Sequence, residues 1–298
     1  MARLLGPSLA GVIAAFGEFA PLAALPRSGQ KIVVRGVRAS DPIVIKVPLR
    51  PIPASRDEET DEALAIADER VRREISAMKA IRSPRVTSIV DGPDKREIEG
   101  RPYVWYSEPF YPQILRDVVS PKWPTKRLAR LVAELLEGLD ALQGSGIVHR
   151  DIKPENIALT AAGSAVLLDF GVSLFTELDR VTEPGKVADF TRPYSAPEQW
   201  TTREDEDAVD VRTDLFCVGL VAYELATGGK HPFGVCDTPE RWRAYTKRVR
   251  ENDYDRDSLR HSGASAQVIE FVDRCLRAAP SARFRNVAQA RAALERCL

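Results

Sequence analysis

The 298-residue sequence predicts an α+β protein of two lobes, a small strand-rich lobe followed by a larger helical one. Two observations predict this fold class. Up to about residue 110, short runs rich in Val and Ile are bounded by turn residues, as is typical of β-strands. From Pro124 onward, apolar residues recur at helical spacing instead. A cleft between two such lobes would be the expected place for a ligand.

The first lobe is expected to contain four strands and one long helix. The helix opens at the acidic segment after Ser55, which with Glu58 fits a capping box, and it ends near Arg82. Apolar residues recur along it at helical spacing: Val71, Ile75, Met78 and Ile81. The strands are expected at 31–37, 42–49, 86–92 and 102–110.

The second lobe is expected to pack its helices around one apolar helix. Residues 213–229 are apolar on nearly all sides, so this helix should run through the core. The leucine stripe from Leu128 to Leu142 predicts an amphipathic helix that stops at Gly144. A short buried strand is expected at 165–171, and two further helices at 267–277 and 287–297.

Charge and cysteine content narrow the class of protein. The chain has 43 basic and 43 acidic residues, which argues against a nucleic-acid binder held by a broad basic face. Its four cysteines are widely spaced, without a Cys-x-x-Cys pair or a histidine at a zinc-like interval. We interpret them as reduced thiols and expect a cytoplasmic protein.

Residues 1–24 form an apolar extension. Glu18, Pro7 and Pro21 interrupt its apolar run, which leaves about ten apolar residues, too few to span a bilayer. The same interruptions argue against a clean signal peptide. The favoured interpretation is a segment that packs on the domain or docks on a partner.

The stretch "GIVHRDIKPENIALT", Gly146 to Thr160, concentrates charged and amide side chains between apolar residues. Asp151 and Asn156 lie on its loop, and Asp169 opens a glycine turn shortly afterwards. Two carboxylates and an amide suit a hard cation such as Mg²⁺, whereas Lys153 suits an anionic oxygen. A cation site, an anion site and a candidate base together indicate phosphoryl transfer.

Three motifs, in this order and spacing, resemble those of a eukaryotic-type (Hanks-type) protein kinase. They are "HRDIKPEN" (His149–Asn156), "DFG" (Asp169–Gly171) and "APE" (Ala196–Glu198). The lysine at Lys153 resembles the Ser/Thr class, and the arginine-rich composition suggests a bacterial source. The resemblance extends from about Gly29 to the end of the chain. It implies a bilobal protein-kinase-like fold.

The implied domain organisation has three parts. Residues 1–24 are an extension without a counterpart in the motifs, 25–107 form the N-lobe, and 108–298 form the C-lobe. The hinge is expected at about 107–111, in the stretch "YSEPF".

The resemblance assigns catalytic roles to four residues. Asp151 would orient the substrate hydroxyl and accept its proton, and Lys153 would neutralise the transferring phosphoryl group. Asn156 and Asp169 would hold Mg²⁺ (or Mn²⁺) against the phosphates of ATP. The transferred group spreads its charge over several oxygens, so catalysis depends largely on positioning and charge stabilisation.

In the first lobe, the resemblance makes Lys46 the residue that binds the α and β phosphates of ATP. Its expected ion-pair partner is Glu74, which borders the apolar stripe of the predicted helix. The glycine-rich loop is degenerate. In one register Pro26, Ser28 and Lys31 take the glycine places, and in another Gly29 is the third glycine.

The adenine pocket is expected to involve both lobes. Val33 and Val44 would lie above the ring and Ala158 below it, and the backbone from Glu108 to Phe110 would hydrogen-bond the base. Ser107 would lie at the back of the pocket.

The resemblance also implies supporting contacts. Glu198 should pair with Arg283, and Asp214 should brace the backbone near His149. His149 itself is expected to be structural, packed beneath Phe170. Arg150 would bind a phosphate on the activation segment, with Thr182 as the first candidate site and Ser173 and Thr176 as alternatives.

The predicted function is that of a Ser/Thr protein kinase. It would transfer the γ-phosphate of Mg·ATP to the hydroxyl of a protein substrate, and autophosphorylation is expected as well. The alternative is a pseudokinase-like ATP-binding scaffold, suggested by the degenerate glycine-rich loop. We expect no nucleic-acid partner and no membrane span, and residues 1–24 could dock a partner.

Overall fold

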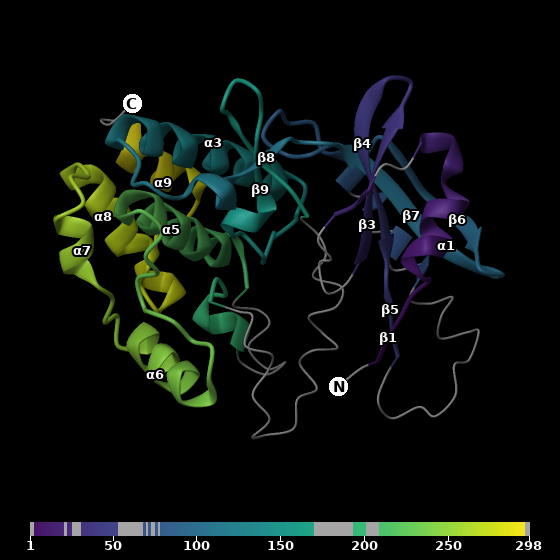
Figure 1. Cartoon of the computed structure of the whole chain (residues 1–298). Helices are drawn as coiled ribbons and strands as arrows, with labels where there is room; N and C mark the ends of the chain where they lie inside the picture. The colour runs from purple at the N-terminus through teal and green to yellow at the C-terminus, as the bar shows by residue number, and fades with distance from the viewer. Residues whose placement is uncertain are drawn as a thin grey trace. The chain divides into compact units, whose positions relative to one another are not determined.

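The computed structural model describes residues 3–20, 23–25, 31–52, 68–69, 71–72, 75–76, 78–169, 193–200 and 209–295. The chain divides into two compact units. Among the described residues, unit 1 holds those up to Arg82 and Thr87–Phe110, and unit 2 holds Ser83–Val86 and the rest (Figure 1). Unit 1 is rich in strands and unit 2 in helices, so the predicted α+β class is confirmed.

Unit 1 contains a five-stranded antiparallel sheet. Its strands are β2 (Ala23–Ala24), β3 (Lys31–Arg38), β4 (Asp41–Pro48), β6 (Asp91–Ile98) and β7 (Arg101–Pro109). They lie in the order β2-β3-β4-β7-β6. The strands β3 and β4 pair along their whole length, and β4 then pairs with β7. The predicted strands at 31–37, 42–49 and 102–110 are therefore confirmed.

The two faces of this sheet differ because side chains alternate along each strand. On one face, Ile43 and Ile45 of β4 pack with Trp105 of β7 in an apolar core. The intervening residues of β4, Val44 and Lys46, therefore belong to the opposite face. This alternation separates the packing face from the face that carries the candidate phosphate-binding lysine.

The N-terminal segment covers the packing face of the sheet. The helix α1 (Leu9–Ala15) and the 3₁₀ turn η1 (Gly17–Phe19) contact β3 and β6 (Figure 1). Val12 and Phe16 have no exposed surface and belong to the sheet's apolar core. The guanidinium of Arg96 lies 4.5 Å from the ring centroid of Phe16. The described part of the extension thus packs on its own domain, as one of the two interpretations expected.

Two further features attach this segment to unit 1. The strand β1 (Arg3–Leu5) pairs antiparallel with β5 (Arg50–Ile52), which directly follows β4. A Cβ atom on Gly36 would lie only 2.9 Å from the carbonyl oxygen of Phe19. Glycine at this position of β3 therefore permits the close approach of η1.

Substitution of Val12 by alanine is expected to lower the free energy of unfolding by about 2 kcal/mol, because it removes fully buried methyl groups and leaves a cavity. Urea unfolding followed by circular dichroism measures the change. The exposed neighbour Ala10, changed to serine, is the control and should alter stability by less than about 0.5 kcal/mol. Equal stabilities of Val12→Ala and the unmodified protein would contradict a structural role for α1.

Unit 1 also contains a helix that ends before residue 81. The described residues from Asp68 to Ala80 are helical, and the predicted apolar stripe is buried: Val71, Ile75, Met78 and Ile81. Its predicted start at Ser55 lies outside the described residues. Asp68 is buried and accepts two hydrogen bonds from Arg50, at 2.9 and 2.8 Å, which ties this helix to β5.

The strand predicted at 86–92 is wrong in position. Val86 forms only an isolated bridge with Leu167, and β6 begins at Asp91. β6 is an edge strand of mostly polar residues, so it lacks the apolar run that identifies an inner strand. The apolar residues of the predicted strand, Val86 and Ile89, are buried in the segment just before β6.

Unit 2 is built mainly from helices. They are α3 (Thr125–Gly144), α5 (Val211–Thr227), α6 (Pro239–Arg250), α7 (Arg256–Arg260), α8 (Ala266–Cys275) and α9 (Val287–Leu294). A small sheet has the order β10-β9-β8, with bounds Ala165–Leu167, Ile157–Leu159 and Gln113–Ile114. Short 3₁₀ turns are η2 (Leu115–Val118), η3 (Pro154–Asn156), η5 (Pro197–Trp200) and η7 (Pro280–Ala282).

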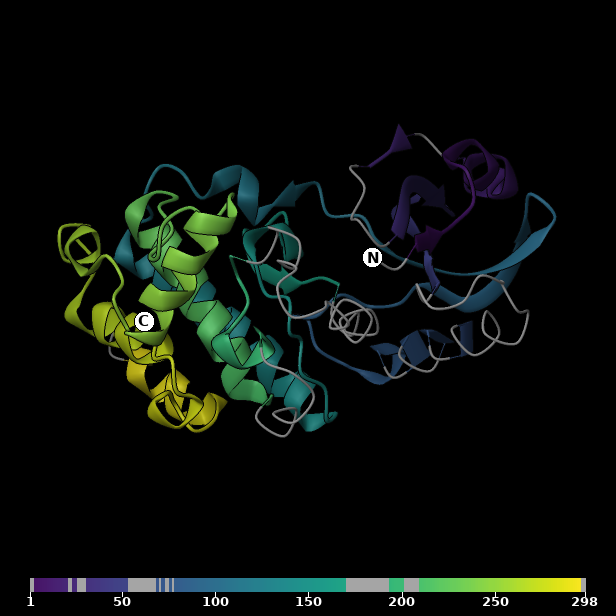
Figure 2. The same cartoon turned by 90° about the horizontal axis from the view of Figure 1, so that it is seen from below.

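The helix α5 is the centre of unit 2, as its apolar composition predicted. Nearly all of its residues are buried, and it contacts α3, α7 and α8. Figure 2 shows its green ribbon against the yellow C-terminal helices. Asp210 caps its N-terminus, and Gly228 ends it with a φ of 75°. A Cβ on Gly219 would lie 2.5 Å from Cβ of Cys275, so glycine allows α8 to pack closely.

The helices α6 and α7 had no counterpart among the predicted elements. Thr238 and Asp255 cap them, and α6 buries only Tyr245 and Val249, so its apolar pattern is sparse. Among the described residues, no helix is long and apolar enough to cross a membrane. The described cysteines, Cys217, Cys236 and Cys275, are buried free thiols.

Candidate active site

The loop between α3 and β9 brings three predicted catalytic side chains into direct contact. Lys153 Nζ donates to both carboxylate oxygens of Asp151, each at 2.9 Å. Asn156 Nδ2 donates to the main-chain oxygen of Asp151 at 2.8 Å and to its Oδ2 at 2.7 Å. The side chain of Asp151 remains 54% exposed. The carboxylate is thus held by two donors yet is open to a substrate.

Asp214 of α5 braces this loop from below, as the resemblance predicted. Its carboxylate accepts hydrogen bonds from the backbone N–H groups of His149 and Arg150, both at 2.8 Å. Arg150 has a φ of 65°, a backbone conformation unfavourable for a non-glycine residue. A strained backbone conformation persists where surrounding contacts hold the residue in place. Here the two hydrogen bonds to Asp214 hold the backbone at the strained residue and at the residue just before it.

Burial shifts the pKa values of both supporting groups. It lowers the pKa of His149, whose Nε2 lies 3.0 Å from the carbonyl oxygen of Leu168. It raises the pKa of Asp214 to about 7, whereas the two backbone donors favour the charged carboxylate. His149 is 1% exposed, which agrees with a structural role.

Asp169 is held close to the same loop by the backbone. The N–H of Leu168 donates to the carbonyl oxygen of Asn156 at 2.9 Å. The negative charges of Asp151 and Asp169 both act to raise the pKa of His149, against the larger effect of burial, so both carboxylates lie near its ring. Asp169 also has a positive φ, 55°. A second strained residue at the same place is typical of a functional site.

The chemistry of these residues fits Mg²⁺. The amide nitrogen of Asn156 donates to Asp151, so its amide oxygen is the atom that can meet a cation. Together with the carboxylate of Asp169 this makes an all-oxygen donor set, which Mg²⁺ prefers. Within the described residues no three His, Cys, Asp or Glu side chains could hold a metal by themselves. The remaining ligands would be water and phosphate oxygens, as is usual for this ion.

The predicted Glu198–Arg283 pair is confirmed. Arg283 donates to the Glu198 carboxylate through two nitrogens, at 2.6 and 2.9 Å, and both side chains are buried. Thr213 of α5 also donates to Glu198, at 2.8 Å. The pair fixes the 3₁₀ turn η5 to α5 and to the C-terminal part of unit 2.

Sequence reasoning missed Gln199. Its side chain accepts from the N–H of Ala196 at 2.9 Å and donates to the carbonyl oxygen of Arg150 at 2.9 Å. It therefore connects the "APE" turn to the catalytic loop. A glutamine in a short turn carries no sequence signal of such a role, because it is ordinarily exposed.

A second network near the loop was also missed. Arg116 of η2 donates to Glu155 at 2.7 Å and lies 3.3 Å from the buried Glu224 of α5. Tyr194 contacts both Arg116 and Glu224. Burial raises the pKa of Glu224, while the bonds from Tyr194 and Arg116 lower it. The network links the catalytic loop to α5 through opposite charges.

In unit 1, Lys46 is buried and pairs with Glu108. Its Nζ lies 2.6 Å from Oε2 of Glu108, and the side chains are 6% and 2% exposed. The predicted partner Glu74 lies outside the described residues, so that pairing stays a prediction. Glu108 was expected to act through its backbone, whereas its side chain reaches the candidate phosphate-binding lysine.

The other residues predicted at the nucleotide are placed as follows. Val33 lies directly opposite Lys46, and Val44 opposite Glu108, so these side chains share one sheet face. Lys31 is buried and belongs to the same face, two residues before Val33. In unit 2, Ala158 is fully buried on β9.

Two expectations for the linking segment need correction. Ser107 alternates with Glu108, so it belongs to the packing face, and its hydroxyl donates to Asp91 at 3.0 Å. The N–H of Phe110 donates to the carbonyl oxygen of Pro42 at 3.0 Å, so it does not serve as the adenine donor in this structure. Both differences follow from the continuation of β7 to Pro109, which extends sheet pairing into the predicted hinge.

Several predicted residues fall outside the described residues. They are Gly29, Glu74, Phe170, Ser173, Thr176 and Thr182. The expectations for the glycine-rich loop and the phosphorylation sites therefore stay predictions.

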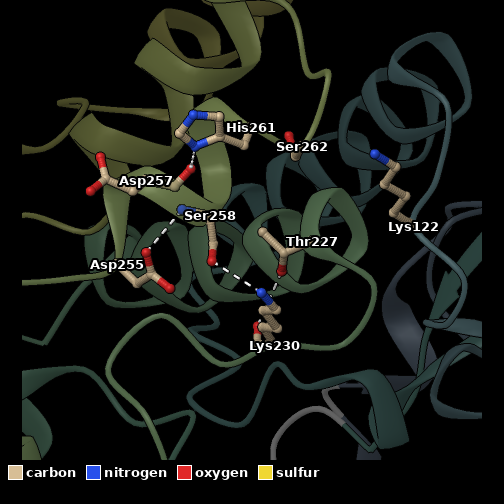
Figure 3. Close-up of a pocket in the computed structure, with 8 residues that line it drawn as sticks. All are labelled: Lys122, Thr227, Lys230, Asp255, Asp257, Ser258, His261 and Ser262. Carbon is tan, nitrogen blue, oxygen red and sulfur yellow. Dashed lines mark hydrogen bonds between the residues drawn. The ribbon is translucent and has the colours of Figure 1, made fainter.

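Unit 2 also contains a polar pocket of about 380 Å³ beside α5 and α7 (Figure 3). It includes none of the predicted site residues. Hydrogen bonds connect some of its polar groups: Lys230 donates to Ser258 at 3.2 Å, and Ser258 N–H donates to Asp255 at 2.9 Å. Its lining mixes both signs of charge, so it does not indicate a particular ligand.

Acid is expected to destabilise unit 2 through His231. Burial lowers the pKa of His231 to about 4, and its Nε2 lies 2.9 Å from the carbonyl oxygen of Pro193. The unfolded chain, with a histidine pKa near 6.5, then binds more protons between about pH 4 and 6.5, so stability falls as the pH falls through this window.

Between pH 7 and pH 5 the unmodified protein should lose about 2 kcal/mol more stability than His231→Gln. Urea unfolding at both pH values measures this difference. Identical losses in the protein and in His231→Gln would refute the assignment.

The fold and the site together define a protein kinase. The family model of the protein kinase domain matches residues 38–295, and the chain belongs to that family. It is a kinase domain of the bacterial Hanks-type Ser/Thr group, as its relatives indicate. The resemblance inferred from the three motifs is thereby confirmed.

The curated relatives are bacterial Ser/Thr kinases. The chain is 33% identical over 232 residues to "Serine/threonine-protein kinase PknB" of Mycobacterium tuberculosis, an alignment covering 76% of this chain and 35% of PknB. It is 32% identical over 166 residues to "Serine/threonine-protein kinase pkn2" of Myxococcus xanthus, covering 54% of this chain and 19% of pkn2. The chain thus spans about a third of the length of PknB.

Proposed function

We propose that this protein transfers the γ-phosphate of Mg·ATP to serine or threonine hydroxyls of protein substrates, including another copy of itself. The observation that carries the proposal is the contact set of Asp151 with Lys153 and Asn156. It combines a partly exposed base, a cation and an amide ligand at one point, as phosphoryl transfer requires.

Each residue has a distinct task in this proposal. Asp151 accepts the proton of the attacking hydroxyl, and Lys153, which already contacts Asp151, neutralises the oxygens of the transferred group. Asn156 and Asp169 hold Mg²⁺, which when bound offsets the charge of the phosphates. Lys46 binds the α and β phosphates, and Val33, Val44 and Ala158 contact the adenine.

The proposal extends to regulation and location. Arg150 would bind a phosphate added to Thr182, Ser173 or Thr176. The buried free thiols of the described cysteines support a reducing, cytoplasmic environment. A partner could dock on residues 1–24 only through their exposed side chains, because Val12 and Phe16 are buried.

The test is transfer of labelled γ-phosphate from ATP, with Mg²⁺, to the protein itself and to a generic basic protein. We expect label on serine or threonine in both, and none when Asp169→Ala replaces the unmodified protein. Mapping the labelled residues tests Thr182. Binding of Mg·ATP without any phosphoryl transfer would overturn the proposal in favour of a nucleotide-binding scaffold. The same result must hold when a phosphorylated form of the protein is added as a possible activator.

A further inference from the structure

The face of the unit 1 sheet that carries Lys46, the candidate phosphate-binding lysine, also carries a carboxylate beside it. Glu108 lies opposite Val44 in the β4–β7 pairing, two residue pairs along from Lys46 and Tyr106 and therefore on the same face of the sheet. Neighbouring pairs of this kind place long side chains of one face within reach of each other. The Lys46–Glu108 distance of 2.6 Å and the near-complete burial of both groups show that they form a tight ion pair.

We propose that Glu108 competes with the phosphates of ATP for Lys46 and thereby lowers the affinity of the protein for ATP. The inference rests on the proposed function, in which Lys46 binds those phosphates. In the nucleotide-free protein Glu108 is a counter-ion of Lys46. When Mg·ATP binds, the ammonium group turns wholly or partly from the carboxylate to the phosphate oxygens.

Two physical effects act in the same direction. A buried ammonium is costly unless it is paired, so Glu108 stabilises the nucleotide-free protein. A phosphate group that meets the same ammonium is then brought close to the Glu108 carboxylate, and like charges at short range in a buried site repel each other. Both effects make the carboxylate favour the unliganded state over the ATP-bound state.

Glutamine at position 108 removes the negative charge and keeps the side-chain shape. Glu108→Gln should therefore bind Mg·ATP about tenfold more tightly than the unmodified protein, a change of about 1.4 kcal/mol. Adenosine, which has no phosphates, should bind both proteins equally. In the Lys46→Met background, Glu108→Gln should raise ATP affinity much less, because the cation for which the two anions compete is gone and only the repulsion between them remains.

Isothermal titration of the 298-residue chain with Mg·ATP and with adenosine measures these affinities, and thermal unfolding with and without Mg·ATP follows stability. Glu108→Gln should unfold at a lower temperature without nucleotide and gain more from added Mg·ATP than the unmodified protein does. The control is Glu134→Gln, another buried carboxylate, which accepts from the N–H of Ala165 in unit 2 at 2.8 Å. It should lower stability without altering ATP affinity.

The outcomes separate the two proposals. Unchanged or weaker ATP binding by Glu108→Gln overturns the competition, as does an equal gain for adenosine, which would place the effect at the base. A gain of undiminished size in the Lys46→Met background overturns it too. A failure of the unmodified protein to bind Mg·ATP would instead overturn the proposed function, and this inference with it.

Discussion

Replacement of Asp151 by asparagine is expected to slow phosphoryl transfer by about 10²–10⁴-fold, because it removes the base that accepts the hydroxyl proton. Asparagine retains the size of the side chain but cannot accept a proton at neutral pH. The carboxylate is 54% exposed and lies on a loop braced from Asp214, so the fold should tolerate the change. Initial rates with a protein substrate at saturating Mg·ATP measure the effect.

The control for this variant is Asp140→Asn, an exposed aspartate on α3. It should retain the full rate. Affinity for Mg·ATP should remain within about twofold in Asp151→Asn, because the proposed phosphate and metal contacts involve other residues. A transfer rate within tenfold of the unmodified protein would show that Asp151 is not the base.

Substitution of Arg283 by methionine should lower the free energy of unfolding by about 3–5 kcal/mol, because it leaves the buried Glu198 carboxylate without its cation. Arg283 also donates to the carbonyl oxygens of Arg277, Ala278 and Arg212, at 2.7, 2.8 and 2.9 Å. These acceptors lose their donor as well. Urea unfolding of both proteins, followed by circular dichroism, gives the difference.

Arg277→Met is the matched control. Arg277 pairs with Asp273, but its side chain is 40% exposed, so the loss should stay near 1 kcal/mol or less. The double variant Glu198→Leu with Arg283→Met should recover part of the stability, because no buried charge is then unpaired. If Arg283→Met lost no more stability than Arg277→Met, the buried pair would not be the anchor of this unit.

Local sequence patterns were enough to predict much of the fold. The apolar helix α5 and the amphipathic helix α3 were predicted from residue spacing, since burial on all sides or on one side leaves a clear period. The edge strand β6 was misplaced, and α6 and α7 were absent from the prediction, because these elements bury few apolar residues. Their sequences resemble exposed loops.

The candidate site likewise contains some contacts that the sequence predicted and others that it did not. Asp151, Lys153 and Asn156 are close in the chain, so their proximity was predictable, and the resemblance predicted the distant contacts of Asp214 and Glu198. Gln199 and Arg116 were missed, because their partners come from segments far away in the sequence. No local period or motif marks such a partner.

The sequence alone determined the family, the two-part α+β organisation and the chemistry of the catalytic loop, because motif residues and apolar periods are local properties of the chain. Only the tertiary structure decided which face of the sheet α1 covers, that Ser107 belongs to the packing face, and that Glu108 reaches Lys46. Those outcomes depend on strand register, and in a β-strand a shift of one residue exchanges the two faces.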